Sequence, residues 1–152
     1  MRAHMFSYTT TVRIHDADPA GVLFFARYFV LAHDAYEAFL ESRGLGAGRI
    51  FRDEAFVIPV VHAEADYRTP LWVGDHATIK LEIEEVRRRS FTVAYEICGP
   101  SGVLACAVRT THVVVSTETK RAVPLPDKLK AALETCRAAD TNSISAGEDE
   151  QR

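Results

Sequence analysis

The chain has 152 residues, of which 47% are apolar and 26% are charged, and its formal net charge is −3. This composition predicts a soluble globular protein with a core of its own, and it argues against a nucleic-acid binder or a membrane span. The three cysteines are an odd number without CxxC spacing, and no apolar secretory signal opens the chain, so we expect a cytoplasmic protein.

The first predicted element is a strand that leads into a sharp turn. Tyr8 and Val12 belong to an alternating pattern over residues 7–14, which is typical of a strand with one covered face. Pro19 restricts Asp18 to an extended conformation, and Gly21 permits a tight bend. We therefore expect a turn over residues 16–21, directly before the next element.

A long amphipathic helix follows, from about Phe24 to Arg43. Its apolar residues recur at helical spacing and form one stripe: Tyr28, Leu31, Ala32, Ala35, Phe39 and Leu40. Gly44 is a suitable C-terminal stop. Three glycines lie within residues 44–48, but they follow a helix rather than a strand, which argues against a nucleotide-binding loop.

The rest of the chain is predicted to be mostly strands, at residues 56–67, 77–84, 91–98 and 103–116. Pro59 interrupts the first of these, so we expect it to be bent or to lie at a sheet edge. Turn residues occupy 70–75 and 99–102. One long helix with about five antiparallel strands predicts an α+β fold in which the sheet wraps round the helix.

The C-terminal part is predicted to contain a short helix and a tail. Asp127 begins a helical pattern that reaches about Ala138, after two prolines. Residues 140–152 are polar and acidic, so we expect them to be disordered. The predicted organisation is therefore one domain over residues 1–139 and a disordered tail over residues 140–152.

Asp18 is the main candidate for chemistry. A carboxylate next to the start of a helix has unpaired backbone N–H groups beside it, and such donors can stabilise the negative oxygen that forms during attack on a carbonyl. The structural alternative is an aspartate that caps the helix or the turn. Asp16 lies two residues away and should point to the other side, so we interpret it as an acceptor that stabilises the loop.

The histidines do not predict a metal site. His33, His62 and His112 lie singly on three separate elements, without carboxylates or cysteines at ligand spacing, and we expect no bound metal. We interpret His33 and His62 as hydrogen-bonding groups of a substrate pocket. The alternative for His33 is a helix histidine with its hydrogen bonds satisfied.

Three consecutive arginines, Arg87, Arg88 and Arg89, lie between two predicted strands. Such a charge run is often only the solvated end of a strand. Planar guanidinium groups can also clamp phosphate through paired hydrogen bonds. The residues alone leave both interpretations open.

The order of elements and the motif Asp18-Pro-Ala-Gly-Val22, followed by aromatic residues and Tyr28, resemble the hotdog fold of the 4-hydroxybenzoyl-CoA thioesterase-like family. The resemblance extends over residues 6–129. It implies that Asp18 is catalytic and that the backbone N–H of Phe25 polarises the thioester carbonyl. It also implies that Gly21, Val22 and Phe24 contact substrate and that the Arg87–Arg89 run grips the phosphates of CoA.

Other segments look more similar to the 1,4-dihydroxy-2-naphthoyl-CoA thioesterases of quinone biosynthesis. These segments are residues 33–37, 59–63, 111–113 and 120–126. One difference speaks against a 4-hydroxybenzoyl substrate: the enzymes for that substrate have, at the position of His33, a carboxylate that reads the substrate hydroxyl. One feature speaks the other way, because a run of three arginines is less typical of the naphthoyl group. The resemblance therefore favours 1,4-dihydroxy-2-naphthoyl-CoA as substrate.

The resemblance implies an acyl-CoA thioester hydrolase in which Asp18 acts as nucleophile or general base. No cofactor is expected, because the thioester is already activated. Alternatives within this class are a 4-hydroxybenzoyl-CoA or benzoyl-CoA thioesterase and a broad short-chain acyl-CoA thioesterase. An alternative of another class is a non-catalytic acyl-CoA-binding protein. Because hotdog relatives pair sheet edges, we expect a homodimer or a dimer of dimers.

Overall fold

The computed structural model describes residues 5–139, and the predicted tail lies outside this range. The elements in chain order are β1 (Phe6–Thr11), the 3-10 turn η1 (Ile14–Asp16), α1 (Arg27–Ser42), α2 (Ala47–Asp53), β2 (Phe56–Val57), β3 (Val60–Tyr67), β4 (His76–Val86), β5 (Ser90–Cys98), β6 (Leu104–Val113), β7 (Val115–Ser116) and α3 (Asp127–Glu134). No helix within residues 5–139 is long and apolar enough to cross a membrane.

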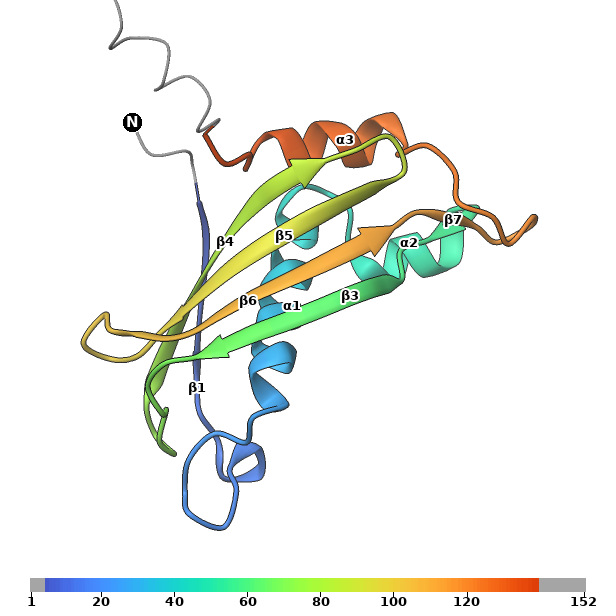
Figure 1. Ribbon diagram of the computed structural model, residues 1–152. Coiled ribbons are helices and arrows are strands. Elements are labelled where there is room, and N and C mark those ends of the chain that lie inside the picture. The colour runs from blue at the N-terminus through green and yellow to red at the C-terminus, as the bar shows by residue number, and fades with distance from the viewer. Residues whose placement is uncertain (1–4, 140–152) are drawn as a thin grey trace, which may run out of the picture.

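The main sheet has five strands in the order β1-β4-β5-β6-β3, and every neighbouring pair is antiparallel. The sheet curves round α1, which runs across its concave face (Figure 1). This arrangement confirms the predicted α+β fold with a five-stranded antiparallel sheet wrapped round one long helix. The strands β1 and β3 form the two edges of the sheet.

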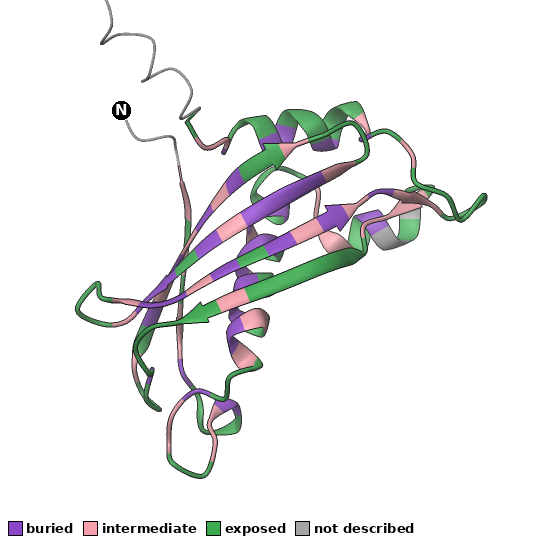
Figure 2. Cartoon of the chain, viewed as in Figure 1, coloured by how far each residue is buried: buried purple, intermediate pink, exposed green. Residues whose placement is uncertain are grey.

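The core lies between α1 and the concave face of the sheet. The helix buries the stripe predicted from its sequence, including Ala35 and Phe39, neither of which is exposed. Alternate residues of β4 and β5, such as Ile79 and Val93, fill the opposite side. Figure 2 shows the contrast between the largely buried β5 and the exposed edge strand β3. Truncating a side chain such as Phe39 to alanine would destabilise the fold by about 3–5 kcal/mol.

Helix α1 begins at Arg27, three residues later than predicted. The N–H of Phe24 donates to the Asp16 carbonyl at 2.9 Å, and the Phe24 carbonyl accepts from Arg27 N–H at 2.8 Å. Residues 24–26 are therefore held in a turn by the preceding loop. At the other end Gly44 has φ +74° and terminates the helix as predicted, because only glycine adopts this conformation without strain.

Three further boundaries differ from the sequence predictions. Pro59 divides the predicted strand 56–67 into β2 and the edge strand β3, and the predicted strand 103–116 is divided into β6 and β7. The short strands β2 and β7 pair in a separate small sheet. Helix α2 was not predicted. Helix α3 stops at Glu134 because residues 136–138 form backbone hydrogen bonds with Ile83 of β4. Ile83 lies beyond the part of β4 that pairs with β1.

Candidate functional site

The loop that carries Asp18 is closed on itself by backbone hydrogen bonds. Asp18 N–H donates to the Val22 carbonyl at 2.9 Å, and Gly21 N–H donates to the Asp18 carbonyl at 3.0 Å. Gly21 has φ +85°, which explains why this position requires glycine. The loop is anchored to the segment before β4, because Val73 N–H donates to the Gly21 carbonyl at 3.1 Å. Its conformation is thus fixed by backbone contacts.

The Asp18 carboxylate is half-buried and oriented by its own loop. Its Oδ1 accepts hydrogen bonds from Ala20 N–H at 2.8 Å and from Val22 N–H at 3.3 Å. Its second oxygen, Oδ2, accepts no hydrogen bond from any residue between 5 and 139. One oxygen therefore positions the side chain, and the other is available to attack a carbonyl or to take a proton from water.

The expectation that Asp18 lies directly at the helix start is wrong. Asp16 is the carboxylate that faces α1: its Oδ1 lies 3.8 Å from Nε of Arg27, the first residue of the helix. Asp16 is buried, and its Oδ2 accepts Arg13 N–H at 3.2 Å, which confirms that it stabilises the loop. The reason for the difference is the turn at residues 24–26, which separates the Asp18 loop from the helix.

Phe25 presents an unpaired backbone donor on the turn that follows the Asp18 loop. Its N–H donates to no other described residue, whereas its carbonyl accepts the Tyr67 hydroxyl at 2.7 Å. Phe25 is 62% exposed, and its ring packs edge-on against that of Phe24. This donor is free to bind an oxygen of a ligand.

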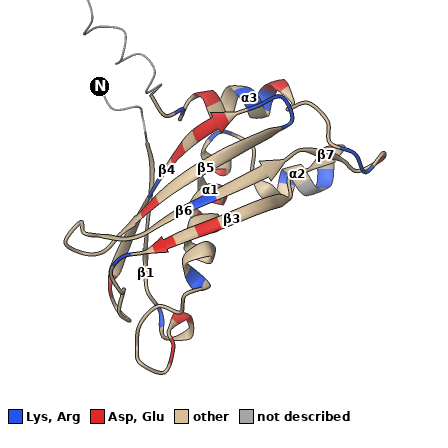
Figure 3. Cartoon of the chain, in the orientation of Figure 1, with Lys and Arg blue, Asp and Glu red and all other residues tan. Residues whose placement is uncertain are grey.

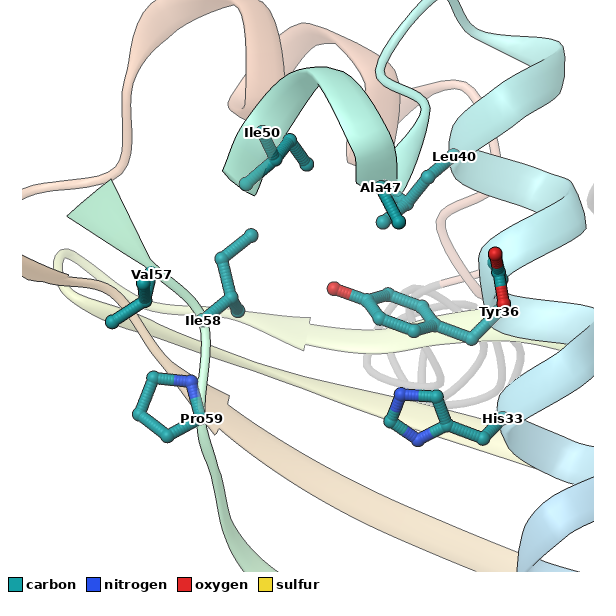
Figure 4. A pocket seen from close by; sticks show the side chains of 9 residues that line it. His33, Tyr36, Leu40, Ala47, Ile50, Val57, Ile58 and Pro59 are labelled. Carbon is teal, nitrogen blue, oxygen red and sulfur yellow. The ribbon is translucent and has the colours of Figure 1, made fainter. Parts of the chain in front are cut away.

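His33 lies on the exposed side of α1, at a cavity of about 400 Å³ between α1, α2 and the link from β2 to β3. The cavity is lined by His33, Tyr36, Glu37, Leu40, Ala47, Ile50, Val57, Ile58 and Pro59 (Figure 4). Its size is in the range of small-molecule pockets, and most of its lining is apolar. His33 therefore lines a cavity in the structure, and its role as a substrate-binding group stays a prediction.

His62 lies on the convex face of the sheet, away from α1. It pairs in register with Thr111, which alternates with the inward-facing Thr110 and His112. Its Nε2 lies 3.7 Å from Oε2 of Glu64. Within one chain the structure does not bring His62 and His33 together. The residues between 5 and 139 contain no cluster of three or more His, Cys, Asp or Glu side chains that could hold a metal ion.

The arginine run forms the turn between β4 and β5, and all three side chains are exposed. Arg87 Nε donates to Glu85 Oε1 at 2.8 Å. The Asp18 loop contacts the segment just before β4, and the arginines follow the last residue of this 11-residue strand. At about 3.3 Å per residue, roughly 33 Å of strand separates the two features. Figure 3 shows the basic turn next to α3, at the far end of the sheet from the loop.

A buried polar cluster beside the pocket was not predicted as a unit. His112 Nε2 lies 2.8 Å from Thr110 Oγ1, which lies 3.3 Å from the Tyr95 hydroxyl. Burial lowers the pKa of His112 to about 4, so the imidazole is neutral at pH 7. The sequence signal was present, since the alternation in residues 103–116 places Thr110 and His112 on the covered face.

Comparison with known proteins identifies the family. The model of the Thioesterase-like superfamily matches residues 12–133. A 1,4-dihydroxy-2-naphthoyl-CoA hydrolase from Rippkaea orientalis is 38% identical over 127 residues, which are 82% of this chain and 92% of the relative. One from Nostoc punctiforme is 35% identical over 132 residues, 87% of this chain and 88% of the relative.

The solved structures give the same result. The crystal structure of a 1,4-dihydroxy-2-naphthoyl-CoA thioesterase from Synechocystis superposes with a TM-score of 0.81 at 31% identity. The superposed residues make up 86% of this chain and 96% of the Synechocystis chain. The fold, the motif around Asp18 and the matched residues together place this chain in the Thioesterase-like superfamily, to which it belongs.

Proposed function

We propose that this protein is an acyl-CoA thioesterase that hydrolyses 1,4-dihydroxy-2-naphthoyl-CoA to the free acid and CoA. The observation that carries the substrate assignment is the 38% identity, over 82% of the chain, to a hydrolase of that thioester. The geometry supports the reaction type, because a carboxylate with one uncommitted oxygen and an unpaired N–H donor follow each other within eight residues. No metal or redox step enters this reaction.

Asp18 and the Phe25 N–H have separate roles in the proposed reaction. Asp18 Oδ2 either takes a proton from water, whose oxygen then attacks the carbonyl, or attacks the carbonyl itself to form an anhydride that water hydrolyses. In both routes the C–S bond breaks, the CoA thiolate gains a proton, and one water is consumed. The Phe25 N–H stabilises the negative carbonyl oxygen, a contribution typically of about 3–4 kcal/mol.

The edge strand β3 provides the surface for a homodimer. It is eight residues long, no strand within residues 5–139 lies beside its outer edge, and Val60, Val61 and Tyr67 are exposed. A long exposed edge of this kind is normally paired or covered. Antiparallel pairing of two β3 strands about a twofold axis satisfies these groups and produces one continuous sheet.

This pairing would complete the site from two protomers. Tyr67, at one end of β3, contacts Phe25, and Pro59, at the other end, lines the cavity with His33. Antiparallel pairing therefore brings the Phe25 turn of one protomer next to the cavity of its partner. The partner's arginine turn comes to the same side. Phe91, just after that turn, pairs with His112 of β6, and His112 pairs with Val60 of β3, so the turn lies at the Val60 end of β3.

A thiol-release assay with a panel of acyl-CoA thioesters tests the proposal. We expect the highest kcat/KM for 1,4-dihydroxy-2-naphthoyl-CoA, with lower values for 4-hydroxybenzoyl-CoA, benzoyl-CoA and short-chain acyl-CoA. A preference for one of these other thioesters would replace the proposed substrate. Tight binding of the thioester without release of CoA would instead identify a non-catalytic acyl-CoA-binding protein.

A further inference from the structure

The hydroxyl of Tyr36 is buried without a hydrogen-bond partner. Tyr36 is only 5% exposed, and its hydroxyl oxygen bonds to no other residue between 5 and 139. Leaving a buried hydroxyl unpaired is unfavourable, and such groups in folded proteins are few. Tyr95, the other buried tyrosine of this region, has its hydroxyl 3.3 Å from Thr110 Oγ1. The unpaired group at Tyr36 therefore calls for a specific explanation.

Packing fixes the direction of the Tyr36 side chain. Its ring centroid lies 4.7 Å from that of His112, and His112 stacks on Phe91 at 4.9 Å with an interplanar angle of 4°. The His33 ring contacts Tyr36 edge-on at 5.6 Å. Since His112 is itself held by Thr110, the phenol cannot turn toward another partner. Its position is thus set before any ligand arrives.

Tyr36 faces the cavity described above. Figure 4 shows its phenol oxygen pointing from α1 toward Ile58, on the opposite side of the cavity. The lining from α2, from the end of β2 and from the link between β2 and β3 offers no side-chain hydrogen bond; it consists of Ala47, Ile50, Val57, Ile58 and Pro59. Burial raises the pKa of Tyr36 well above its ordinary value, so the phenol keeps its proton as a donor.

We propose that Tyr36 determines substrate specificity, and that its hydroxyl hydrogen-bonds to an oxygen substituent on the aromatic ring of the acyl group. This inference rests on the proposed function. The flat faces of the ring would pack on the apolar lining, and the substituent would displace the half-buried side chain of Ile58 to reach the phenol. A site with a fixed, unpaired polar group discriminates strongly against an analogue that cannot bond to it.

The test compares two thioesters that differ only in the ring hydroxyls, 1,4-dihydroxy-2-naphthoyl-CoA and 2-naphthoyl-CoA. In Tyr36→Phe we expect the ratio of their kcat/KM values to fall at least about tenfold, while 2-naphthoyl-CoA is cleaved as well as before. The matched control is Tyr95→Phe, which removes a buried hydroxyl that does not line the cavity and should leave the ratio unchanged. An unchanged ratio in Tyr36→Phe, or an equal loss on both thioesters, would overturn the inference.

A binding measurement separates this inference from the proposed function. We would titrate the free acids, 1,4-dihydroxy-2-naphthoate and 2-naphthoate, into the full-length protein by calorimetry under nitrogen. A preference for the hydroxylated acid that Tyr36→Phe abolishes supports the role of Tyr36 even if the wild type cleaves no thioester. Absence of any preference overturns it even if the thioesterase activity is present. Tyr36→Phe should melt no lower than the wild type, because it removes only an unpaired hydroxyl.

Discussion

The two ends of the sheet are built in different ways. At the Asp18 end, hydrogen bonds between residues a few positions apart hold the carboxylate, and the aromatic residues Phe24 and Phe25 are exposed. At the other end, the cavity is assembled from α1, α2 and the link before β3, and the buried His112 comes from β6. The first end is a local motif, whereas the second depends on segments that meet only in the folded chain.

This difference separates the functions of the two ends. The Asp18 end carries the groups that can react, and none of its loop residues lines the cavity. The other end has the cavity, which is lined mostly by apolar side chains, and the arginines. Substitutions at the first end should therefore change turnover, and substitutions at the second end should change stability, selectivity and binding.

The largest effect is expected for Asp18→Asn. Asparagine keeps an oxygen that can accept from Ala20 and Val22, so the loop should persist, but it cannot act as base or nucleophile. We expect kcat to fall by at least about a hundredfold with unchanged circular dichroism. The control is Glu118→Gln, at an exposed carboxylate after β7, which should retain full activity. Near-normal turnover in folded Asp18→Asn would reject the catalytic role.

At the other end, His112 should make stability depend on pH. Its pKa is lowered to about 4, by burial first and by His33 second, so the unfolded chain binds a proton at higher pH than the folded one. The stability that His112 contributes is fully present above its ordinary pKa near 6.5 and decreases as the pH falls toward 4. The change corresponds to about 3 kcal/mol.

Urea unfolding of the wild type and of His112→Phe between pH 7 and pH 4 measures this contribution. Phenylalanine retains stacking on Phe91 and Tyr36 but cannot titrate. We expect the free energy of unfolding to decrease more steeply with falling pH in the wild type than in the variant. Parallel curves for the two proteins would mean that His112 does not titrate as inferred, and other groups would account for any common slope.

The same contrast explains what the sequence could predict. The helix stripe, the strand alternation and the turn at Gly21 are local patterns, and the structure confirms them together with the fold and the family. Helix α2, the β2–β7 pair and the unpaired Tyr36 hydroxyl depend on tertiary contacts, which no periodicity in the sequence encodes. The stripe around Tyr28 and Phe39 predicted that the face carrying Tyr36 is covered, but it could not predict that the phenol finds no partner.

Site residues divide along the same line. Asp18 and Phe25 were selected from a contiguous motif, and their local geometry suits the proposed roles, which remain predictions. His62 was selected as a single residue, and its face of the sheet is set by the pairing with Thr111 after an irregularity in β3. A strand register of this kind changes the face of every following residue, and the sequence of one strand does not specify it.

Mixed dimers test whether the two ends cooperate between protomers. His33→Trp should fill the cavity from an exposed helix position, and Asp18→Asn should disable the other end. If each site combines the Asp18 end of one protomer with the cavity of its partner, a dimer of the two inactive variants contains one intact site. We then expect activity to recover to about half that of the wild type.

The mixing experiment needs differently tagged chains, so that the mixed dimer can be isolated and exchange verified. The reference is a mixed dimer of Asp18→Asn with wild type, which should show the same activity. If the isolated variant pair stays inactive while this reference is active, both ends act within one chain. An active species with the mass of one chain, 16.9 kDa, would exclude the dimeric site altogether.

The smallest effect is expected for the triple replacement of Arg87, Arg88 and Arg89 by alanine. The arginines are exposed and remote from the bond that breaks, so their contacts with CoA phosphates should be equally strong in the ground state and the transition state. We expect KM for the CoA thioester to rise about tenfold with little change in kcat.

The same acyl group on N-acetylcysteamine, which lacks the nucleotide, should be cleaved equally well by variant and wild type. As a control, Arg121, Lys128 and Lys130 are replaced by alanine, which removes the same positive charge from nearby positions. This control measures the long-range attraction between the protein and the negative CoA, an effect that should weaken with added salt. An equal loss on both thioesters, or an equal loss in the control, would show that the arginine turn does not bind phosphate.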